Sequence, residues 1–308
     1  ITISIFIRCN IFQHTSITKE TFYNIINKSN KFNKLDPRKK KYIIDYIFCV
    51  GKTSVINLKK IIKGNFYISG SLNNNYFYKK KKFDKKSIIF ISQFPLEKRV
   101  NIRNFNNKFK YLNSEKIFFQ NVLDFCHKKK IKLKIIPKTY DKIGDEAYKN
   151  ILNLNSNFKK EDFINLERKF YDFLIGKNNY TFIKRTLPTS SYINAQKYLF
   201  FLCYNSSLGV ELLSTGKRVA FFPMKKVDEH IYGWKYSNKK HKGHFNFWEK
   251  RKKGLIWSHS QNKKEVFRVL KNITSNKKIG NLKNTIVGFN KNNTVFKNFF
   301  LKKFKISL

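Results

Sequence analysis

Acidic residues are scarce in this chain of 308 residues. Only 19 Asp and Glu stand against 65 Lys and Arg, so the formal net charge is +46 at pH 7. A basic excess of this size usually indicates a polyanion partner such as nucleic acid. Here the excess is almost all lysine, is scattered along the chain, and accompanies abundant Asn, Ile, Phe and Tyr, as an AT-rich genome would encode. Nucleic-acid binders more often concentrate their charge and favour arginine, so no specific nucleic-acid partner is predicted.

Cysteine and long apolar runs are also in short supply. The cysteines are Cys9, Cys49, Cys126 and Cys203. They are far apart and form no CxxC pair, which predicts buried thiols in a reducing compartment. The close pair His241 and His244 has no Cys or carboxylate cluster beside it, so neither a metal nor a cofactor is expected. No stretch reaches the roughly 18 apolar residues of a spanning helix, and no signal peptide is visible, which favours a cytoplasmic location.

Short apolar runs alternate with amphipathic stretches from residue 86 onward. Strands are predicted over 86–94, 131–138, 180–185, 199–204 and 217–222. Helices are predicted over 114–130, 160–176, 189–198, 207–216 and 262–273. Strands and helices that alternate at this spacing require right-handed crossovers, which build a parallel sheet. The predicted fold class is therefore α/β, with a Rossmann-like parallel sheet that carries helices on both faces.

The residues before this sheet show a strand, a short helix and a second strand, as in part of another α/β unit. A polar, lysine-rich segment over 76–86 separates the two patterns and is the predicted linker. The chain opens on Ile1 rather than Met, so we expect a fragment that lacks N-terminal residues. The predicted organisation is an incomplete N-terminal domain (1–75), the linker, and a C-terminal domain with late helices (87–308).

The stretch CYNSSLGVELLSTGKRVAFF contains residues suited to a phosphate and a ribose. A predicted strand delivers Asn205, Ser206 and Ser207, and a helix begins near Ser207, where free N–H groups and the helix dipole suit a phosphate. Gly209 is expected to let a ligand approach the backbone. Glu211 lies four residues after Ser207 on the same helix face, where a carboxylate can accept two ribose hydroxyls. The alternative is that Ser206 is an ordinary N-cap and Glu211 an ordinary surface residue.

Other polar residues follow the ends of predicted strands. Ser92 and Gln93 follow the first strand, Lys138 the second, and Lys184 and Arg185 the third. In a parallel sheet these residues share one edge with the serine turn, where a lysine or arginine can neutralise a diphosphate without a metal. Arginine suits phosphate best because of its planar fork. The alternative for the lysines is a solvated strand end.

The segment YNSSLGVELLSTGKRVAFF resembles the donor-nucleotide segment of GT-B glycosyltransferases. It is most similar to bacterial surface-carbohydrate biosynthesis transferases related to the nucleotide-sugar 2-epimerase architecture. Three further segments resemble that family in the same order: GNFYISGSLNNN (Gly64–Asn75), SIIFISQF (Ser87–Phe94) and KGLIWSHSQNKKEVFRVL (Lys253–Leu270). The resemblance implies that residues 87–308 are the C-terminal GT-B domain and that the N-terminal domain is a remnant. It carries over no catalytic acid or base.

The function implied is transfer of a sugar from a nucleotide-sugar donor to a glycan or lipid-linked acceptor. The basic surface is expected to help hold the protein at the cytoplasmic face of an anionic inner membrane. The basic, aromatic segment 225–259 is either an active-site loop or a poorly ordered insert. Two alternatives stay open: a truncated transferase without activity, and a polyanion-binding or membrane-surface protein built on the same scaffold.

Overall fold

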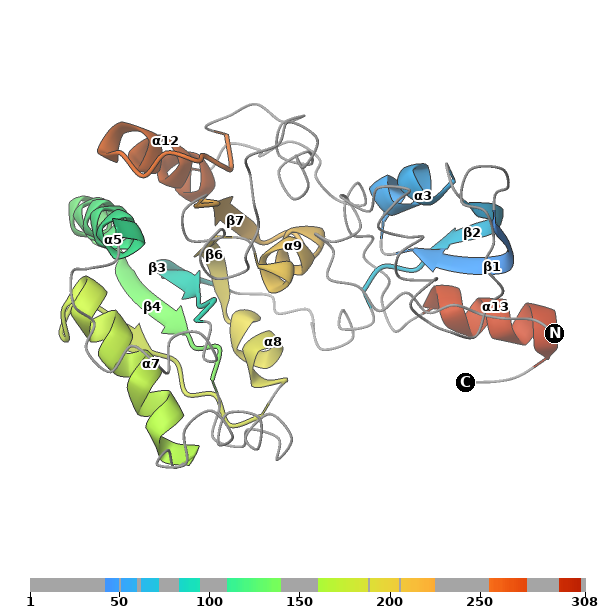
Figure 1. The fold of residues 1–308 in the computed structure, drawn as a ribbon, viewed down its shortest axis with the longest axis horizontal. Helices are drawn as coiled ribbons and strands as arrows, with labels where there is room; N and C mark the ends of the chain where they lie inside the picture. The colour runs from blue at the N-terminus through green and yellow to red at the C-terminus, as the bar shows by residue number, and fades with distance from the viewer. Residues whose placement is uncertain are drawn as a thin grey trace.

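The computed structural model describes residues 42–49, 51–59, 62–71, 83–94, 110–139, 160–187, 189–204, 206–224, 255–275 and 294–305. These residues form a two-stranded sheet and a five-stranded sheet, and every strand pairs in parallel with its neighbours (Figure 1). The predicted α/β class with parallel strands is confirmed. Within the described ranges, no helix combines the length and apolar character that crossing a membrane requires.

The larger sheet has the strand order β5-β4-β3-β6-β7. Its strands are β3 (Asp84–Ile91), β4 (Lys132–Ile136), β5 (Thr181–Phe182), β6 (Tyr198–Cys203) and β7 (Arg218–Phe221). All five lie within predicted strands or within two residues of them. The chain builds outward from β3 through β4 to β5, then returns to the other side of β3 for β6 and β7. The topological switch point therefore lies between β3 and β6.

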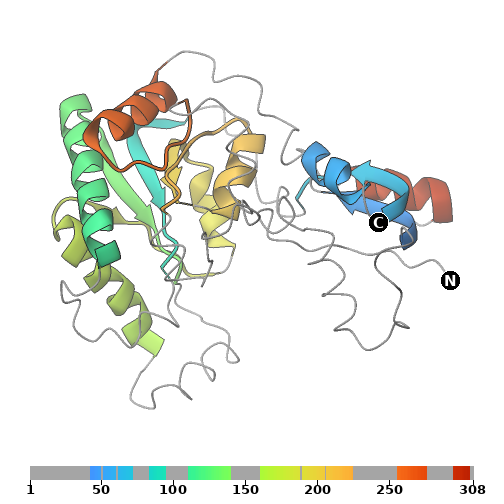
Figure 2. The ribbon, with the colours of Figure 1, turned by 45° about the horizontal axis from the view of Figure 1, so that its top comes forward.

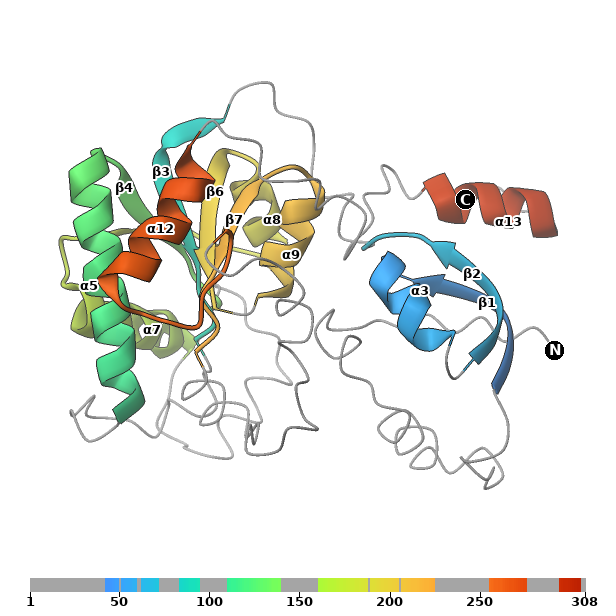
Figure 3. The same ribbon diagram turned by 90° about the horizontal axis from the view of Figure 1, so that it is seen from above.

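Helices cover both faces of this sheet. They are α5 (Lys110–Lys129), α7 (Lys160–Ile175), α8 (Ser190–Ala195), α9 (Ser207–Ser214) and α12 (Lys263–Thr274). Helices α5, α7 and α12 lie on one face, and α8 and α9 lie on the other (Figures 1 and 3). Between them the core is rich in aromatic rings, and Phe90 of the central strand packs edge-on against Phe119 with ring centroids 5.0 Å apart. Continuous apolar strands are what a parallel sheet buried on both faces requires.

The smaller sheet pairs β1 (Tyr42–Cys49) with β2 (Ile62–Ile68), and α3 (Lys52–Leu58) connects the two strands. Helix α13 (Thr294–Phe304) packs on this unit, where Phe296 and Phe299 are buried against Phe48 (Figure 2). The predicted C-terminal domain (87–308) includes this helix, whereas in the structure the helix packs on the smaller unit. The periodicity of a helix shows that it needs an apolar partner, but not which one. Most of the predicted linker, residues 76–82, lies outside the described residues.

Candidate functional site

The carboxyl ends of β3 and β6 flank the switch point of the larger sheet. Ser92 and Gln93 directly follow β3, and Ser206 directly precedes α9 after β6. In open α/β sheets, ligands bind in the crevice outside the carboxyl ends of the strands at this point. Because all strands are parallel, Lys138 and Arg185 also follow strand ends at the same edge. The predicted site residues that follow strand ends thus share one edge, whereas Ser207, Gly209 and Glu211 belong to α9 and Asn205 lies outside the described residues.

Ser206 occupies the N-cap position of α9. Its backbone is extended (φ −94°, ψ 131°), and its carbonyl accepts a hydrogen bond from the amide of Val210 at 3.2 Å. Within the described part of the chain, its hydroxyl makes no capping bond to the first turn. An ordinary N-cap serine would make that bond. Ser206 therefore occupies the N-cap position, but its hydroxyl does not make the hydrogen bond that usually caps a helix.

Gly209 has a packing role that the sequence analysis did not foresee. A Cβ atom at this position would lie 2.7 Å from Sγ of Cys203 and 3.2 Å from Cε1 of Phe221. The side of Gly209 that lacks a Cβ therefore faces β6 and β7, and glycine lets α9 lie close to the sheet. On that side the backbone approaches the sheet, and the expectation that Gly209 lets a ligand approach the backbone stays a prediction.

Glu211 is buried in the second turn of α9, with 4% of its surface exposed. Its Oε1 accepts a hydrogen bond from the hydroxyl of Ser71 at 2.5 Å. Ser71 follows β2 and is buried too, so this contact joins the smaller α/β unit to the larger one. The alternative that Glu211 is an ordinary surface residue is wrong. A buried carboxylate requires charge-assisted hydrogen bonds, and the Ser71 hydroxyl supplies one.

Glu167 is a second buried carboxylate, and the sequence analysis missed it. It projects from α7 with no exposed surface and accepts hydrogen bonds from the backbone amides of Lys138 and Thr139, both at 2.9 Å. The hydroxyls of Thr139 and Ser92 also donate to it, and Ser92 Oγ lies 2.8 Å from the hydroxyl of Tyr171. Glu167 thereby ties the ends of β3 and β4 together. The signal was an acid three and four residues before Phe170 and Tyr171, on the apolar stripe of the helix.

Arg185 binds two carbonyls of the same turn after β4. Its Nη1 donates to the carbonyl of Pro137 at 3.1 Å and also to the carbonyl of Lys138. The neighbouring Lys184 is exposed, and its carbonyl accepts a hydrogen bond from Asn194 of α8 at 2.9 Å. Lys138 is exposed as well. The structure thus brings Ser92, Lys138 and Arg185 together around one turn, while Lys184 is tied to α8.

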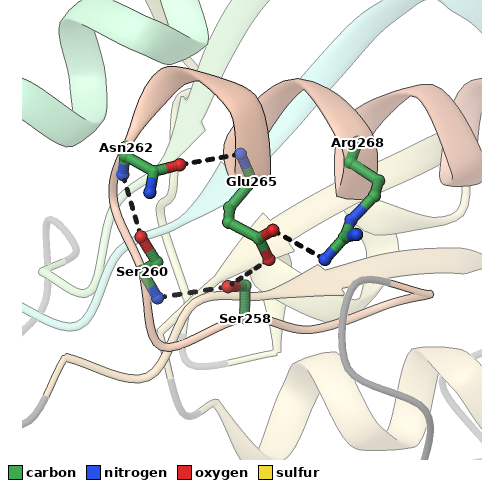
Figure 4. A network of polar contacts seen from close by, with 5 residues as sticks. All are labelled: Ser258, Ser260, Asn262, Glu265 and Arg268. Carbon is green, nitrogen blue, oxygen red and sulfur yellow. Dashed lines mark hydrogen bonds and ion pairs between the residues drawn. The ribbon is translucent and has the colours of Figure 1, made fainter.

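The segment before α12 pairs with the end of β7. Trp257 forms a parallel bridge with Phe221, the last residue of β7. Figure 4 shows the polar contacts that follow: Asn262 Oδ1 accepts from the amide of Glu265 at 2.9 Å, and the Glu265 carboxylate accepts from Ser258 at 3.1 Å and from Arg268 at 2.6 Å. This is a reinforced helix cap. It fixes the turn that carries His259, whose ring lies against Trp257 with centroids 5.0 Å apart.

Cysteine thiols and metal-ligating side chains are the remaining groups that could take part in chemistry. Cys49, Cys126 and Cys203 are buried free thiols, as predicted, and burial raises the pKa of the Cys203 thiol from 9.0 to about 12. Such a thiol is a poor nucleophile. Among the described residues, no cluster of three or more His, Cys, Asp or Glu side chains is placed to hold a metal ion. Cys9 and residues 225–254 of the predicted loop lie outside the described residues.

Comparisons with known proteins give one family and several solved structures. A family model described as "putative O-antigen biosynthesis protein" matches residues 25–161 and 147–305. Similar structures include a "putative UDP-N-acetylglucosamine 2-epimerase from Listeria monocytogenes", with 10% identity, a TM-score of 0.48, and coverage of 86% of this chain and 61% of that one. Another is the "S. aureus MnaA-UDP co-structure", with 13% identity, a TM-score of 0.46, and coverage of 85% and 60%. The chain thus spans about three fifths of the length of these two proteins. No curated protein matches it.

Proposed function

Since this chain belongs to the family described as "putative O-antigen biosynthesis protein", we propose that it is a glycosyltransferase, or a related surface-glycan transferase, that uses a nucleotide-activated sugar. Membership of the family connects the chain with surface-carbohydrate biosynthesis. The acceptor in this proposal is a growing glycan or its lipid-linked precursor. The lysine-rich surface would hold the protein at the cytoplasmic face of an anionic membrane, where such acceptors are built.

The observation that carries the proposal is the buried carboxylate of Glu211 in the helix that follows the switch point. A nucleotide diphosphate would lie against the amides of the first turn of α9, with the hydroxyls of Ser206 and Ser207 as further donors. The ribose would then reach Glu211 one turn further along the helix. A carboxylate is acceptor-only when ionised, so it suits a pair of hydroxyl donors.

Lys138 and Arg185 have different parts in this proposal. The exposed Lys138 lies on the turn after β4, where its ammonium group would neutralise the diphosphate in place of a metal. Arg185 donates to the carbonyls of that turn and so fixes the backbone that carries Lys138. Glu167 fixes the same backbone by accepting hydrogen bonds from the amides of Lys138 and Thr139. Ser92 and Gln93 would line the same crevice from the end of β3.

Calorimetric titration with UDP, GDP, ADP and CDP tests the donor site. Glu211→Gln should weaken binding about ten- to a hundredfold, because a hydrogen bond to a charged group contributes roughly 1.5–3 kcal/mol. Glu265→Gln is the matched control, since that carboxylate binds Ser258 and Arg268 at the start of α12 and should not affect the nucleotide. If Glu211→Gln binds as tightly as the parent and only melts at a lower temperature, Glu211 has a purely structural role and the proposed donor site is wrong.

Product analysis tests the reaction itself. Incubation with a nucleotide sugar and a lipid-linked glycan acceptor should release nucleoside diphosphate, and omission of the acceptor should stop the release. A new nucleotide-sugar isomer without acceptor would instead indicate epimerisation. Nucleotide binding without either product would indicate a member of the family that does not catalyse. Salt-sensitive binding to polyanions, without nucleotide binding, would favour the polyanion-binding alternative.

A further inference from the structure

The contact between Ser71 and Glu211 joins two segments that are 140 residues apart in the chain. The serine hydroxyl donates to Oε1 at 2.5 Å, and only 7% of Ser71 and 4% of Glu211 is exposed. A hydroxyl that donates to an ionised carboxylate makes one of the stronger hydrogen bonds available to a neutral group. It is also the same bond that a ribose hydroxyl would make to the same oxygen.

The burial of Glu211 has a direct consequence for a nucleotide. With so little of the carboxylate exposed, a sugar hydroxyl can reach Oε1 only if the group that covers this oxygen moves away. The Ser71 hydroxyl is in that position. A nucleotide hydroxyl that takes this position on Oε1 must therefore replace that of Ser71, and part of the binding free energy is used to break the existing bond.

The backbone around Ser71 is arranged so that such an exchange can be local. The amide of Ser69 donates to the carbonyl of Cys49 at 2.9 Å, which anchors the end of β2 beside β1. Gly70 then has φ +70°, a conformation that glycine adopts readily and most other residues do not. The chain thus turns at a glycine immediately before Ser71, so rotation there moves the Ser71 hydroxyl without breaking the Ser69 anchor.

We propose that Ser71 is an internal substitute for a ribose hydroxyl: it donates to Glu211 in the nucleotide-free protein, and the nucleotide displaces it. This inference rests on the proposed function, because it takes Glu211 as the carboxylate that binds ribose. Its consequence is that nucleotide binding releases the smaller α/β unit from α9 at this contact. Binding of the nucleotide and the position of the smaller α/β unit are therefore coupled through Oε1 of Glu211.

Three serine variants test the displacement. Ser71→Ala removes the competing hydroxyl and should tighten binding of whichever of UDP, GDP, ADP or CDP the parent binds, by about three- to tenfold. Ser71→Thr keeps a hydroxyl and should bind like the parent. Ser69→Ala is the matched control, because the Ser69 hydroxyl donates to the carbonyls of Cys49 and Gly70 and not to Glu211. It should leave the affinity unchanged.

A measurement on the parent protein keeps the test independent of how the variants fold. Saturation with nucleotide should speed hydrogen exchange at the amides of Gly70 and Ser71, because these residues lose their contact with α9, while the amide of Ser69 stays bonded to the carbonyl of Cys49. Slower or unchanged exchange there would overturn the proposal, and so would weaker or unchanged binding by Ser71→Ala. The proposed function fails separately: in that case none of the four nucleotides binds the parent or Ser71→Ala, or the Glu211→Gln variant binds them like the parent.

Discussion

A Cβ atom built on Gly209 would lie 2.7 Å from the sulfur of Cys203, closer than Cβ atoms come to other heavy atoms in proteins. The two residues belong to α9 and β6, so this approach sets how near the helix lies to the sheet. The N-terminus of α9 and the buried Glu211 are positioned by the same packing. The glycine is thus a structural requirement for the position of α9.

Gly209→Ala should lower the free energy of unfolding by about 1–3 kcal/mol through overpacking against Cys203 and Phe221. Helix propensity alone predicts the reverse, a gain of about 1 kcal/mol for alanine over glycine. The sign of the change in a urea titration therefore decides between the two effects. Ser207→Ala, on the half-exposed first turn of the same helix, is the control and should change stability by less. A more stable Gly209→Ala variant would contradict the packing argument.

Glu167→Ala should be among the most destabilising single substitutions in the larger unit. It leaves the amides of Lys138 and Thr139 without their acceptor, and the buried amide of Thr139 left unsatisfied costs about 1–3 kcal/mol on its own. Glu167→Gln keeps one oxygen acceptor and should cost less. Thermal melting measures both, with Lys169→Ala on the exposed side of α7 as the control. Equal melting temperatures for Glu167→Ala and the control would refute this structural role.

The larger sheet could be predicted from the sequence because its evidence is local. A strand buried on both faces is a continuous apolar run, as in Ile88–Ile91, and it stands out in a chain that is otherwise rich in lysine. The serine turn followed by Glu211 is equally local, since strand, turn and helix follow one another within a dozen residues. Because the strands were predicted to be parallel, the serine turn was expected at the carboxyl edge of the sheet.

The other features of the fold and the site depend on contacts between residues far apart in the chain, and the spacing of residues in the sequence cannot show such contacts. Nothing near Ser71 indicates a partner 140 residues away, and the apolar face of α13 fits the larger sheet as well as the smaller one when judged by periodicity alone. The packing role of Gly209 could not be predicted, because a glycine beside a ligand and a glycine beside a sheet look identical in sequence. Glu167 was overlooked because an acid in a helix is usually solvated.

The buried thiols predict a pH dependence. Burial raises the pKa values of Cys126 and Cys203 from 9.0 to about 12, so both stay protonated in the folded protein at pH 9–11 while the unfolded chain ionises. The folded state then binds more protons, and stability should fall as the pH rises above about 9. At pH 8 both thiols should react slowly with a maleimide, as peptide mapping by mass spectrometry can show. Rapid native labelling of Cys203 would contradict its burial.

Helix α13 packs on the smaller unit through its buried aromatic side chains. Phe299 packs edge-on against Phe48 with ring centroids 4.9 Å apart and is 7% exposed. Removing a buried phenyl ring costs about 3–5 kcal/mol, which is much of the stability that a two-stranded sheet with one covering helix can have. Phe299→Ala should therefore speed hydrogen exchange in β1 and β2 while leaving β3 and β6 protected.

Leu301→Ala is the matched control for this helix. Leu301 lies two residues further along α13 but is 55% exposed, so its loss should leave exchange in β1 and β2 unchanged. If Phe299→Ala speeds exchange equally in both sheets, the two units unfold together and α13 does not stabilise the smaller one separately. If neither variant affects β1 and β2, the helix does not hold the smaller sheet at all, and the assignment of α13 to that unit is wrong.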